Sequence, residues 1–375
     1  MAAVSAVVMV VQLPGPHATA WHFFELAVDL LGGAGDGTEG TGLSLYADHP
    51  ELQFGPLAVV AAAPFTWLGP SGGEVAVMVV GSALGLVVVK LLIDTVELLR
   101  PGALARMPVW TTFGTGALVV VTWGDVAVRT AHLDDALAWT ATMVGVRAVA
   151  GARGGVATVA LAVAAAVKPW AVVFAPLASV PPAAAGRPGW WRWSRPVVAG
   201  GVALATWLPF VVAEPATLDT SDFGIENDPT SVLRALGVGA ATTPDWVRPV
   251  QLVGGVAAVG VLVLWRRWPA AVLAGVGWRL LFDPGAHRYY TIGVVLGGLL
   301  LELTTRPGRF PWWTLGGAVV LEVTALPDAP AGPGRYLRAV VVIAGIVAAA
   351  RSQPVDDRGT FGPVVDAPAP ARLAP

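Results

Sequence analysis

The sequence predicts an all-α protein, a polytopic transmembrane bundle of helices, and two observations lead to this prediction. Only 13% of the 375 residues are charged and 55% are hydrophobic, with a mean hydropathy of +0.68. Soluble domains carry roughly 25% charged residues, so a water-soluble chain of this length would need far more charge to cover its surface. Apolar runs also recur along most of the chain, at a spacing suited to repeated bilayer crossings.

The composition also excludes several classes of protein. A transmembrane β-barrel needs stretches of roughly ten residues that alternate between apolar and polar, whereas residues 339–350 are apolar on every face. Cysteine is absent, so disulfides, thiol nucleophiles and thiolate metal sites are excluded. The formal net charge of -2, with no dense basic stripe, argues against a nucleic-acid partner.

The N-terminal region begins with an apolar segment, residues 2–13, that is too short to span a membrane alone, because a spanning helix needs about 20 residues. No Lys or Arg precedes it, so it fits a signal peptide poorly. Residues 15–55 are expected to form an exterior segment with a Gly-rich loop at 32–42. Within that segment, residues 21–31 set aromatic and aliphatic side chains against polar ones, which predicts an amphipathic helix at the membrane interface.

Further apolar segments follow, and several are shorter than a full crossing. They span residues 57–68, 75–93, 109–123, 136–150, 156–180, 197–212, 250–265, 270–282, 291–303, 312–326 and 339–350. Pro64 interrupts the first of them, and Lys168-Pro169 splits the segment 156–180. We therefore expect short, Pro-broken and re-entrant helices, which a membrane tolerates only where protein or a cavity covers the freed backbone.

The orientation in the membrane is predicted from the Lys and Arg residues of short loops, which favour the cytoplasm. Basic residues alternate along the chain with acidic loops that we place outside the cell. The basic series is Arg147, Arg153, Arg187, Arg192, Arg195, Arg266, Arg267, Arg306, Arg309, Arg351 and Arg358. The acidic series is Asp125, Asp134, Asp135, Glu214, Asp219, Asp222, Glu226, Asp228 and Asp245. Arg335 and Arg338 do not follow this rule, because the alternation places them on the exterior side.

The alternation is consistent up to the last span only if residues 156–180 enter the membrane and return at Lys168-Pro169. Residues 1–351 are then a single transmembrane domain with exterior segments at 15–55 and 213–248. The tail, residues 352–375, is rich in proline and charge, and is predicted to be a disordered cytoplasmic segment.

Lys168 is the sharpest candidate for a functional residue. A lysine within an apolar stretch costs roughly 2.5–3.5 kcal/mol on insertion scales. Pro169 removes a backbone donor and breaks the helix beside it. An ammonium at such a break suits an anionic substrate group such as phosphate. The alternative is a lysine whose ammonium reaches the lipid headgroups.

A second candidate is the segment 129–135, which carries His132, Asp134 and Asp135 into an apolar helix. Carboxylates there suit a general base or a grip on sugar hydroxyls. The alternative is that one of the two acids caps the helix.

Two further loops carry weaker candidates. Asp48 and Gln53 lie in a polar cluster before the segment 57–68, where an ordinary solvated loop is the alternative; the spacing gives no recognised metal site. His287 and Arg288 lie in the loop 283–290, where Arg288 suits a bidentate phosphate contact and the two tyrosines that follow suit an interfacial belt.

These elements together resemble the GT-C superfamily of membrane glycosyltransferases, and within it the actinobacterial polyprenol-phosphate-mannose-dependent mannosyltransferases. The resemblance covers roughly residues 15–325 and rests on short motifs. They are Leu45-Tyr46 with Gln53-Phe-Gly-Pro-Leu57, the polar loop into a helix at 131–137, Lys168-Pro169, and Asp283-Pro with His287-Arg-Tyr-Tyr290.

The resemblance implies an inverting enzyme that moves a sugar, with mannose as the candidate, from a polyprenyl-phosphate donor to a lipid or glycan acceptor at the exterior face of the cell membrane. It implies an acidic residue whose carboxylate takes the proton of the acceptor hydroxyl. It also implies a positively charged residue that holds the donor phosphate, and Lys168 and Arg288 match this second role by position. No cofactor is expected, and a divalent cation is left open. Membrane lipids are the other expected partners.

The chain departs from that family at one place. In the family, the catalytic acidic residue usually follows the first span, whereas this sequence reads Ala18-Thr-Ala-Trp-His22 there and has no Asp or Glu. The catalytic acid is then expected at Asp134 or Asp135, with Asp48 as a further candidate, unless the chain is an inactive member that serves as a structural partner. The other alternative is a transporter or lipid flippase in which Lys168 and the broken helices line a path.

Overall fold

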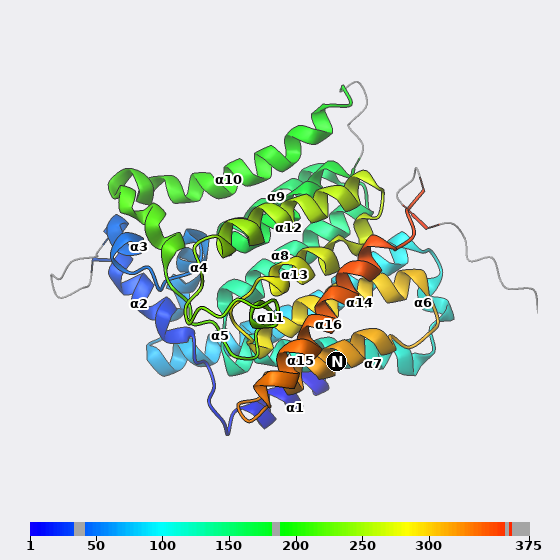
Figure 1. Ribbon diagram of the computed structural model, residues 1–375, viewed down its shortest axis with the longest axis horizontal. Coiled ribbons are helices and arrows are strands. Elements are labelled where there is room, and N and C mark those ends of the chain that lie inside the picture. Colours follow the sequence, from blue (N-terminus) through cyan, green and yellow to red (C-terminus); the bar gives the residue numbers. More distant parts are fainter. Residues whose placement is uncertain (34–41, 182–187, 357–359, 362–375) are drawn as a thin grey trace, which may run out of the picture.

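The computed structural model describes residues 1–33, 42–181, 188–356 and 360–361, and this part of the chain is an all-α bundle, as predicted (Figure 1). Its one β pairing in these ranges is an isolated bridge between Glu226 and Thr242. The α-helices are α1 (Ala2–Gln12), α2 (Trp21–Leu31), α3 (Leu45–Asp48), α4 (Pro56–Thr66), α5 (Pro70–Leu99), α6 (Ala103–Arg106), α7 (Val109–Gly124), α8 (Leu133–Ala150), α9 (Gly154–Val167), α10 (Trp191–Ala213), α11 (Val232–Ala235), α12 (Val247–Leu264), α13 (Ala271–Leu281), α14 (Thr291–Thr305), α15 (Trp312–Thr324) and α16 (Ala331–Ala350).

Five helical stretches of the described chain are long and apolar enough to cross a membrane. They are α5, α7 together with the π-helical segment η2 (Asp125–Arg129), α10, α12 and α16. The longest, α5, has 30 residues, and at 1.5 Å per residue it is about 45 Å long, well beyond the roughly 30 Å of a hydrocarbon core. The outer face of α10 is almost bare of protein, with Val197 and Val212 each 74% exposed, as expected for a surface that faces lipid.

The predicted break at Lys168-Pro169 is confirmed. Helix α9 ends at Val167, Lys168 has an extended backbone with φ −139° and ψ 107°, and the chain continues as the 3₁₀ segment η3 (Pro169–Ser179). The second half is therefore 3₁₀ and not α-helical, with Pro169 at its start and Pro176 within it. Ala162 and Ala175, on either side of the break, pack into one small cluster, so the chain folds back on itself at Lys168.

The helix predicted at 21–31 is confirmed as α2, whereas its place at the membrane interface stays a prediction. Its buried residues are Trp21, Phe24, Ala27 and Leu30, which recur at helical spacing on one face. This face packs on α4, where the ring of Trp21 meets the edge of Phe65 at 6.4 Å between centroids. The Gly-rich loop predicted at 32–42 lies mostly outside the described residues.

The last helix differs from its predicted bounds. Helix α16 begins at Ala331, eight residues before the segment predicted at 339, and so includes Arg338. That side chain is 3% exposed and donates from Nη1 to the Leu321 carbonyl at 3.0 Å and to the Thr324 hydroxyl at 3.2 Å on α15. Arg338 therefore stabilises the packing of α16 on α15 and is not a charge of a loop. Of the two arginines that did not fit the predicted orientation, Arg335 and Arg338, only Arg335 still counts against it.

The start of the C-terminal tail packs on the bundle, in contrast to the disorder predicted from Ser352. Val355 is buried, and its N–H donates to the Arg266 carbonyl at 2.8 Å. Phe361 is also buried; its N–H donates to the Leu99 carbonyl at 3.0 Å, and the Arg100 guanidinium lies over its ring. The rest of the predicted tail, residues 362–375, and the basic residues Arg187 and Arg358 lie outside the described chain.

Candidate functional site

The site is built where the break after α9 meets the start of α8. The Lys168 ammonium contacts Oδ2 of Asp134 directly and lies 3.5 Å from Oδ2 of Asp135. The Lys168 side chain is 12% exposed and the two carboxylates are 0% and 3% exposed. A buried cation thus has two buried anions as partners, which is the condition for keeping charge inside a protein. We call Lys168, Asp134, Asp135 and His132 the Lys168 cluster.

The loop before α4 closes over the break. The Gly55 N–H donates to the Val167 carbonyl at 2.8 Å, which satisfies a carbonyl at the end of α9. The contact is so close that a Cβ atom on Gly55 would lie 2.0 Å from the Ala166 carbonyl oxygen. Glycine is therefore required at this position to allow the approach of the two backbones.

The two carboxylates lie in the first turn of α8, where the positive end of the helix dipole favours anions. The N-cap residue is His132, whose side chain makes no capping hydrogen bond. Asp134 accepts from one of the free N–H groups of the first turn, whereas helix capping does not explain Asp135. Oδ1 of Asp134 accepts from the Asp135 N–H at 2.8 Å, and Nδ1 of His132 lies 3.3 Å from the same oxygen. Asp134 is fully engaged, whereas Oδ2 of Asp135 accepts no hydrogen bond from the described residues.

A third segment, which runs from the last turn of α13 to the start of α14, completes the site. The Arg279 guanidinium lies over the rings of Trp170 and Tyr290, at 4.5 Å from each, and its Nε is 3.4 Å from Oδ2 of Asp283. The ring of Tyr289 lies 4.4 Å from that of His132, so this segment contacts the Lys168 cluster directly.

A small cavity lies at the centre of these elements. Asp135, Arg279, Tyr289 and Tyr290 line it together with Trp139, Trp170, Val276 and Leu280. Its volume is about 10 Å³, which is close to the space that one water molecule occupies. The indole N–H of Trp170, like Oδ2 of Asp135, makes no hydrogen bond within the described chain, so the cavity region has both a free donor and a free acceptor.

The predicted loop residue His287 lies beside the site. Its ring stacks on Tyr289 at 5.2 Å between centroids, and Tyr289 in turn contacts His132. Burial lowers the pKa of His287, and the charge of Asp283 opposes that shift only in part. The exterior segment predicted at 213–248 covers the same loop, because the Asp228 N–H donates to the Pro284 carbonyl at 2.8 Å.

Arg288, in contrast, points away from the Lys168 cluster. Its Nε donates to Glu322 on α15 at 2.6 Å, and its Nη2 lies 3.4 Å from Asp125. Both edges of the guanidinium therefore face acids of the protein. The cation that does reach the site is Arg279, which the sequence reasoning passed over. The sequence does contain a feature that points to Arg279, because an ionisable residue inside an apolar segment, here 270–282, is a candidate functional residue by default.

Asp48 and Gln53 also lie apart from the cluster. Asp48 ends α3 and is exposed, and its carboxylate makes no polar contact with the other described residues. Gln53 donates to the Pro50 carbonyl at 2.6 Å and accepts from Arg248 at 3.3 Å. Gln53 is two residues from Gly55 and therefore lies at the rim of the site. Asp48 has no contact of this kind with the Lys168 cluster among the described residues.

The Lys168 cluster includes one set of ligand atoms compatible with a metal ion. One atom each from His132, Asp134 and Asp135 lie within 4.8 Å of one another. Oxygen and imidazole ligands suit several divalent cations. The Lys168 ammonium lies against the same two carboxylates, so the ammonium and a divalent ion would compete for one place.

Comparisons with known proteins add no relationship to this geometry. No protein-family model, no curated protein and no solved structure matches the chain.

Proposed function

We propose that the chain is a multi-pass membrane glycosyltransferase, and that the Lys168 cluster is its active site at the exterior face of the cell membrane. The reaction would transfer a sugar, with mannose as the candidate, from a polyprenyl phosphate to a lipid or glycan acceptor. The observation that carries the proposal is the meeting of three distant segments, residues 132–135, 168–170 and 279–290, around one buried set of acids, bases and aromatic rings.

Asp135 is the proposed general base. Oδ2 of Asp134 contacts the Lys168 ammonium directly, whereas Oδ2 of Asp135 lies 3.5 Å from it, accepts no hydrogen bond from the described residues and borders the cavity. A carboxylate in this state is suited to take the proton of an acceptor hydroxyl. The acceptor oxygen would then bond to the anomeric carbon as the bond from that carbon to the phosphate oxygen breaks, and the lipid phosphate would leave with the electron pair.

Lys168 and Arg279 are the proposed contacts of the donor phosphate, since both are cations beside the cavity. Trp139 and Trp170, whose rings lie 5.0 Å apart, offer apolar faces for a sugar ring. The cavity of about 10 Å³ is far smaller than a sugar, so binding requires the loop 283–290 to move outward. No role in this proposal falls to Arg288 or Asp48.

The test is donor turnover by the purified protein in lipid nanodiscs, with a radiolabelled polyprenyl-phosphate mannose and an acceptor lipid. Asp135→Asn should reduce the rate by roughly 10²–10⁴-fold, the usual contribution of a general base. Asp245→Asn, an exposed acid before α12, is the matched control and should keep the wild-type rate. Equal rates in the two variants would refute the site.

A second candidate function is movement of a cation or proton across the membrane. Among the described residues around the cavity, the three carboxylates Asp134, Asp135 and Asp283 face two permanent cations, Lys168 and Arg279. An excess of buried negative charge beside a water-sized cavity suits a small cation better than a phosphate. Uptake of a cation into proteoliposomes, lost in Asp135→Asn and without cleavage of the sugar donor, would favour this function.

A further inference from the structure

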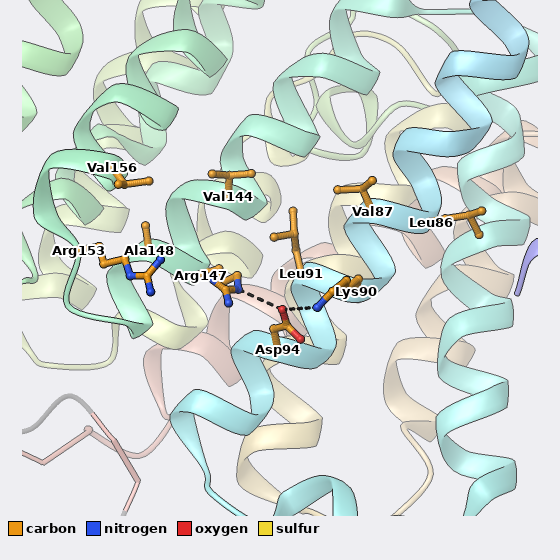
Figure 2. Close-up of a pocket in the computed structure, with 10 residues that line it drawn as sticks. All are labelled: Leu86, Val87, Lys90, Leu91, Asp94, Val144, Arg147, Ala148, Arg153 and Val156. Carbon is orange, nitrogen blue, oxygen red and sulfur yellow. Dashed lines mark hydrogen bonds and ion pairs between the residues drawn. The ribbon is translucent and has the colours of Figure 1, made fainter.

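A second charged site lies at the opposite end of the bundle from the Lys168 cluster. Helix α8 runs from Asp134 to Arg147 over 13 residues, which separates its two ends by about 20 Å. Helix α9 runs antiparallel to α8, from Arg153 at its N-cap to Lys168 at its C-cap. A groove of about 480 Å³ opens at the Arg147 end, between α5, α8 and the start of α9 (Figure 2). We call it the Asp94 groove.

The polar floor of the Asp94 groove carries a surplus of positive charge. One oxygen of Asp94, Oδ2, accepts from the Lys90 ammonium at 2.8 Å and from Nε of Arg147 at 3.2 Å, as Figure 2 shows. Arg153 also lines the groove and has no ion-pair partner in the described ranges. Lys90 and Arg147 contact the Asp94 carboxylate and Arg153 lines the same groove, so the groove holds three cations and one carboxylate. The Nη groups of Arg147 make no hydrogen bond to the described protein.

The walls of the same groove are apolar and open to the outside. Leu86, Val87 and Leu91 on α5 face Val144 on α8 and Val156 on α9. Val87 is 45% exposed and Val156 is 50% exposed. Charged groups at one end and a bare aliphatic surface at the other match the two parts of a lipid molecule, a headgroup and its acyl chains.

The depth of Lys90 along α5 fits the level of lipid headgroups. Between Glu74 and Lys90, helix α5 has an uncharged run of 15 residues, Val75–Val89, and the two charged residues lie about 24 Å apart along the helix. They are therefore near the two edges of a hydrocarbon core of roughly 30 Å. Lys90 and Asp94 follow directly, where α5 would leave the hydrocarbon. An anionic lipid there is attracted by each nearby Lys or Arg.

We propose that the Asp94 groove binds the phosphate of an anionic phospholipid, with Arg147 and Arg153 contacting the phosphate and the aliphatic walls contacting the first part of the acyl chains. A phosphodiester carries a single negative charge, which the surplus of cations more than balances, and the planar fork of arginine matches phosphate oxygens. This site is separate from the Lys168 cluster, and its occupancy does not depend on the chemistry proposed there.

The test is native mass spectrometry of the delipidated, detergent-purified protein titrated with phosphatidylglycerol. Arg153→Gln and Lys90→Gln each remove one exposed charge and should weaken binding roughly five-fold. Arg309→Gln is the matched control, since that arginine is exposed at the same end of the bundle but outside the groove, and it should bind as the wild type does. Phosphatidylcholine, whose headgroup has no net charge, should bind more weakly than phosphatidylglycerol.

Three results would overturn the proposal. The first is equal phosphatidylglycerol binding by the wild type and both groove variants, which would place the lipid elsewhere. The second is equal binding of phosphatidylcholine, which would indicate a site for acyl chains alone. The third is displacement of phosphatidylglycerol by inorganic phosphate at the same concentration, which would indicate a site for free anions.

Discussion

The site that each charged side chain reaches in this protein depends on the partners it meets in the fold more than on its position in the sequence. Lys168 and Arg279 reach the same site, whereas Arg288, which the loop pattern favoured, is held by Glu322 and Asp125. Sequence spacing identified the loop but not the direction of each side chain. That direction depends on which acids from η2 and α15 pack against the loop, and this is decided only in the folded chain.

The Lys168–Asp134 pair leads to a prediction on stability. Lys168→Met would leave Asp134, which is 0% exposed, without its cation, and breaking a buried pair in this way costs roughly 3–5 kcal/mol. We expect a clear fall in the thermal unfolding midpoint of the purified protein, followed by tryptophan fluorescence.

The matched control for that prediction is Lys90→Met, because the Lys90 side chain is 74% exposed and its pair with Asp94 is a surface one, worth at most about 1 kcal/mol. Adding Asp134→Asn to Lys168→Met should restore part of the lost stability. A midpoint unchanged in Lys168→Met would show that the pair is not buried as described.

His287 leads to a prediction on pH. Burial lowers the pKa of His287 below its ordinary value of 6.5, so the folded protein binds this proton less tightly than the unfolded chain does. The neutral imidazole contributes fully to the free energy of unfolding above pH 6.5. This contribution is lost as the pH falls from 6.5 through the lower pKa of the folded state, because the unfolded chain binds the proton more tightly. The charges that face it are Asp283, Asp228, His132 and Arg279.

The pH prediction is measured as the unfolding midpoint between pH 7.5 and pH 5. The wild type should lose more stability across this range than His287→Gln, which has no proton to gain. His22→Gln, a change at an exposed histidine of α2, should follow the wild type. A wild-type curve that runs parallel to that of His287→Gln would contradict the assignment.

At the scale of elements, the sequence predicted best those features that have a local cause. Pro169 broke the helix where expected because proline removes a donor and clashes with the preceding turn. The buried face of α2 was predicted in part, since Phe24 and Leu30 are buried whereas Leu26, an aliphatic residue of the same segment, is exposed. The start of α16 was missed because Gly332, Pro333 and Gly334 resemble a loop. Tertiary contacts of Arg338 with α15 stabilise the helix there, and no local pattern contains that information.

The joint between the loop 53–55 and the end of α9 leads to a prediction on packing. Gly55→Ala would place a Cβ atom 2.0 Å from the Ala166 carbonyl oxygen, and overpacking of this kind typically costs 1–3 kcal/mol. The backbone of Gly55, with φ −79°, is open to alanine, so the loss would come from the clash alone. A lower unfolding midpoint and a weakened site at Lys168 are expected together.

Gly200→Ala on α10 is the control for the packing prediction, since nothing lies within 4 Å of the added Cβ. Alanine there should be neutral or slightly stabilising, because it favours the helix over glycine. If Gly55→Ala behaves like Gly200→Ala, the loop does not close on the break.

At the scale of the whole molecule, the bundle has two chemically different ends. The Lys168 cluster, the loop 283–290 and the segment 213–248 lie at one end, where α8 and α14 begin. Arg147, Arg153 and the loop after α14 lie at the other, since the 15 residues of α14 span about 22 Å. This separation agrees with the alternation of acidic and basic loops in the sequence, and it predicts that the two ends face opposite sides of a membrane.

Cysteine labelling tests this arrangement directly, because the chain has no cysteine of its own. Asp48→Cys and Arg309→Cys each place a thiol at an exposed position, the first near the Lys168 end and the second beyond α14. In intact cells, a membrane-impermeant maleimide should label Asp48→Cys alone, and both variants should react after the membrane is opened. Labelling of Arg309→Cys alone would invert the orientation and place the Lys168 cluster inside the cell. Labelling of both in intact cells would mean that the two ends do not lie across a membrane from each other, and the proposed set of spans would then be wrong.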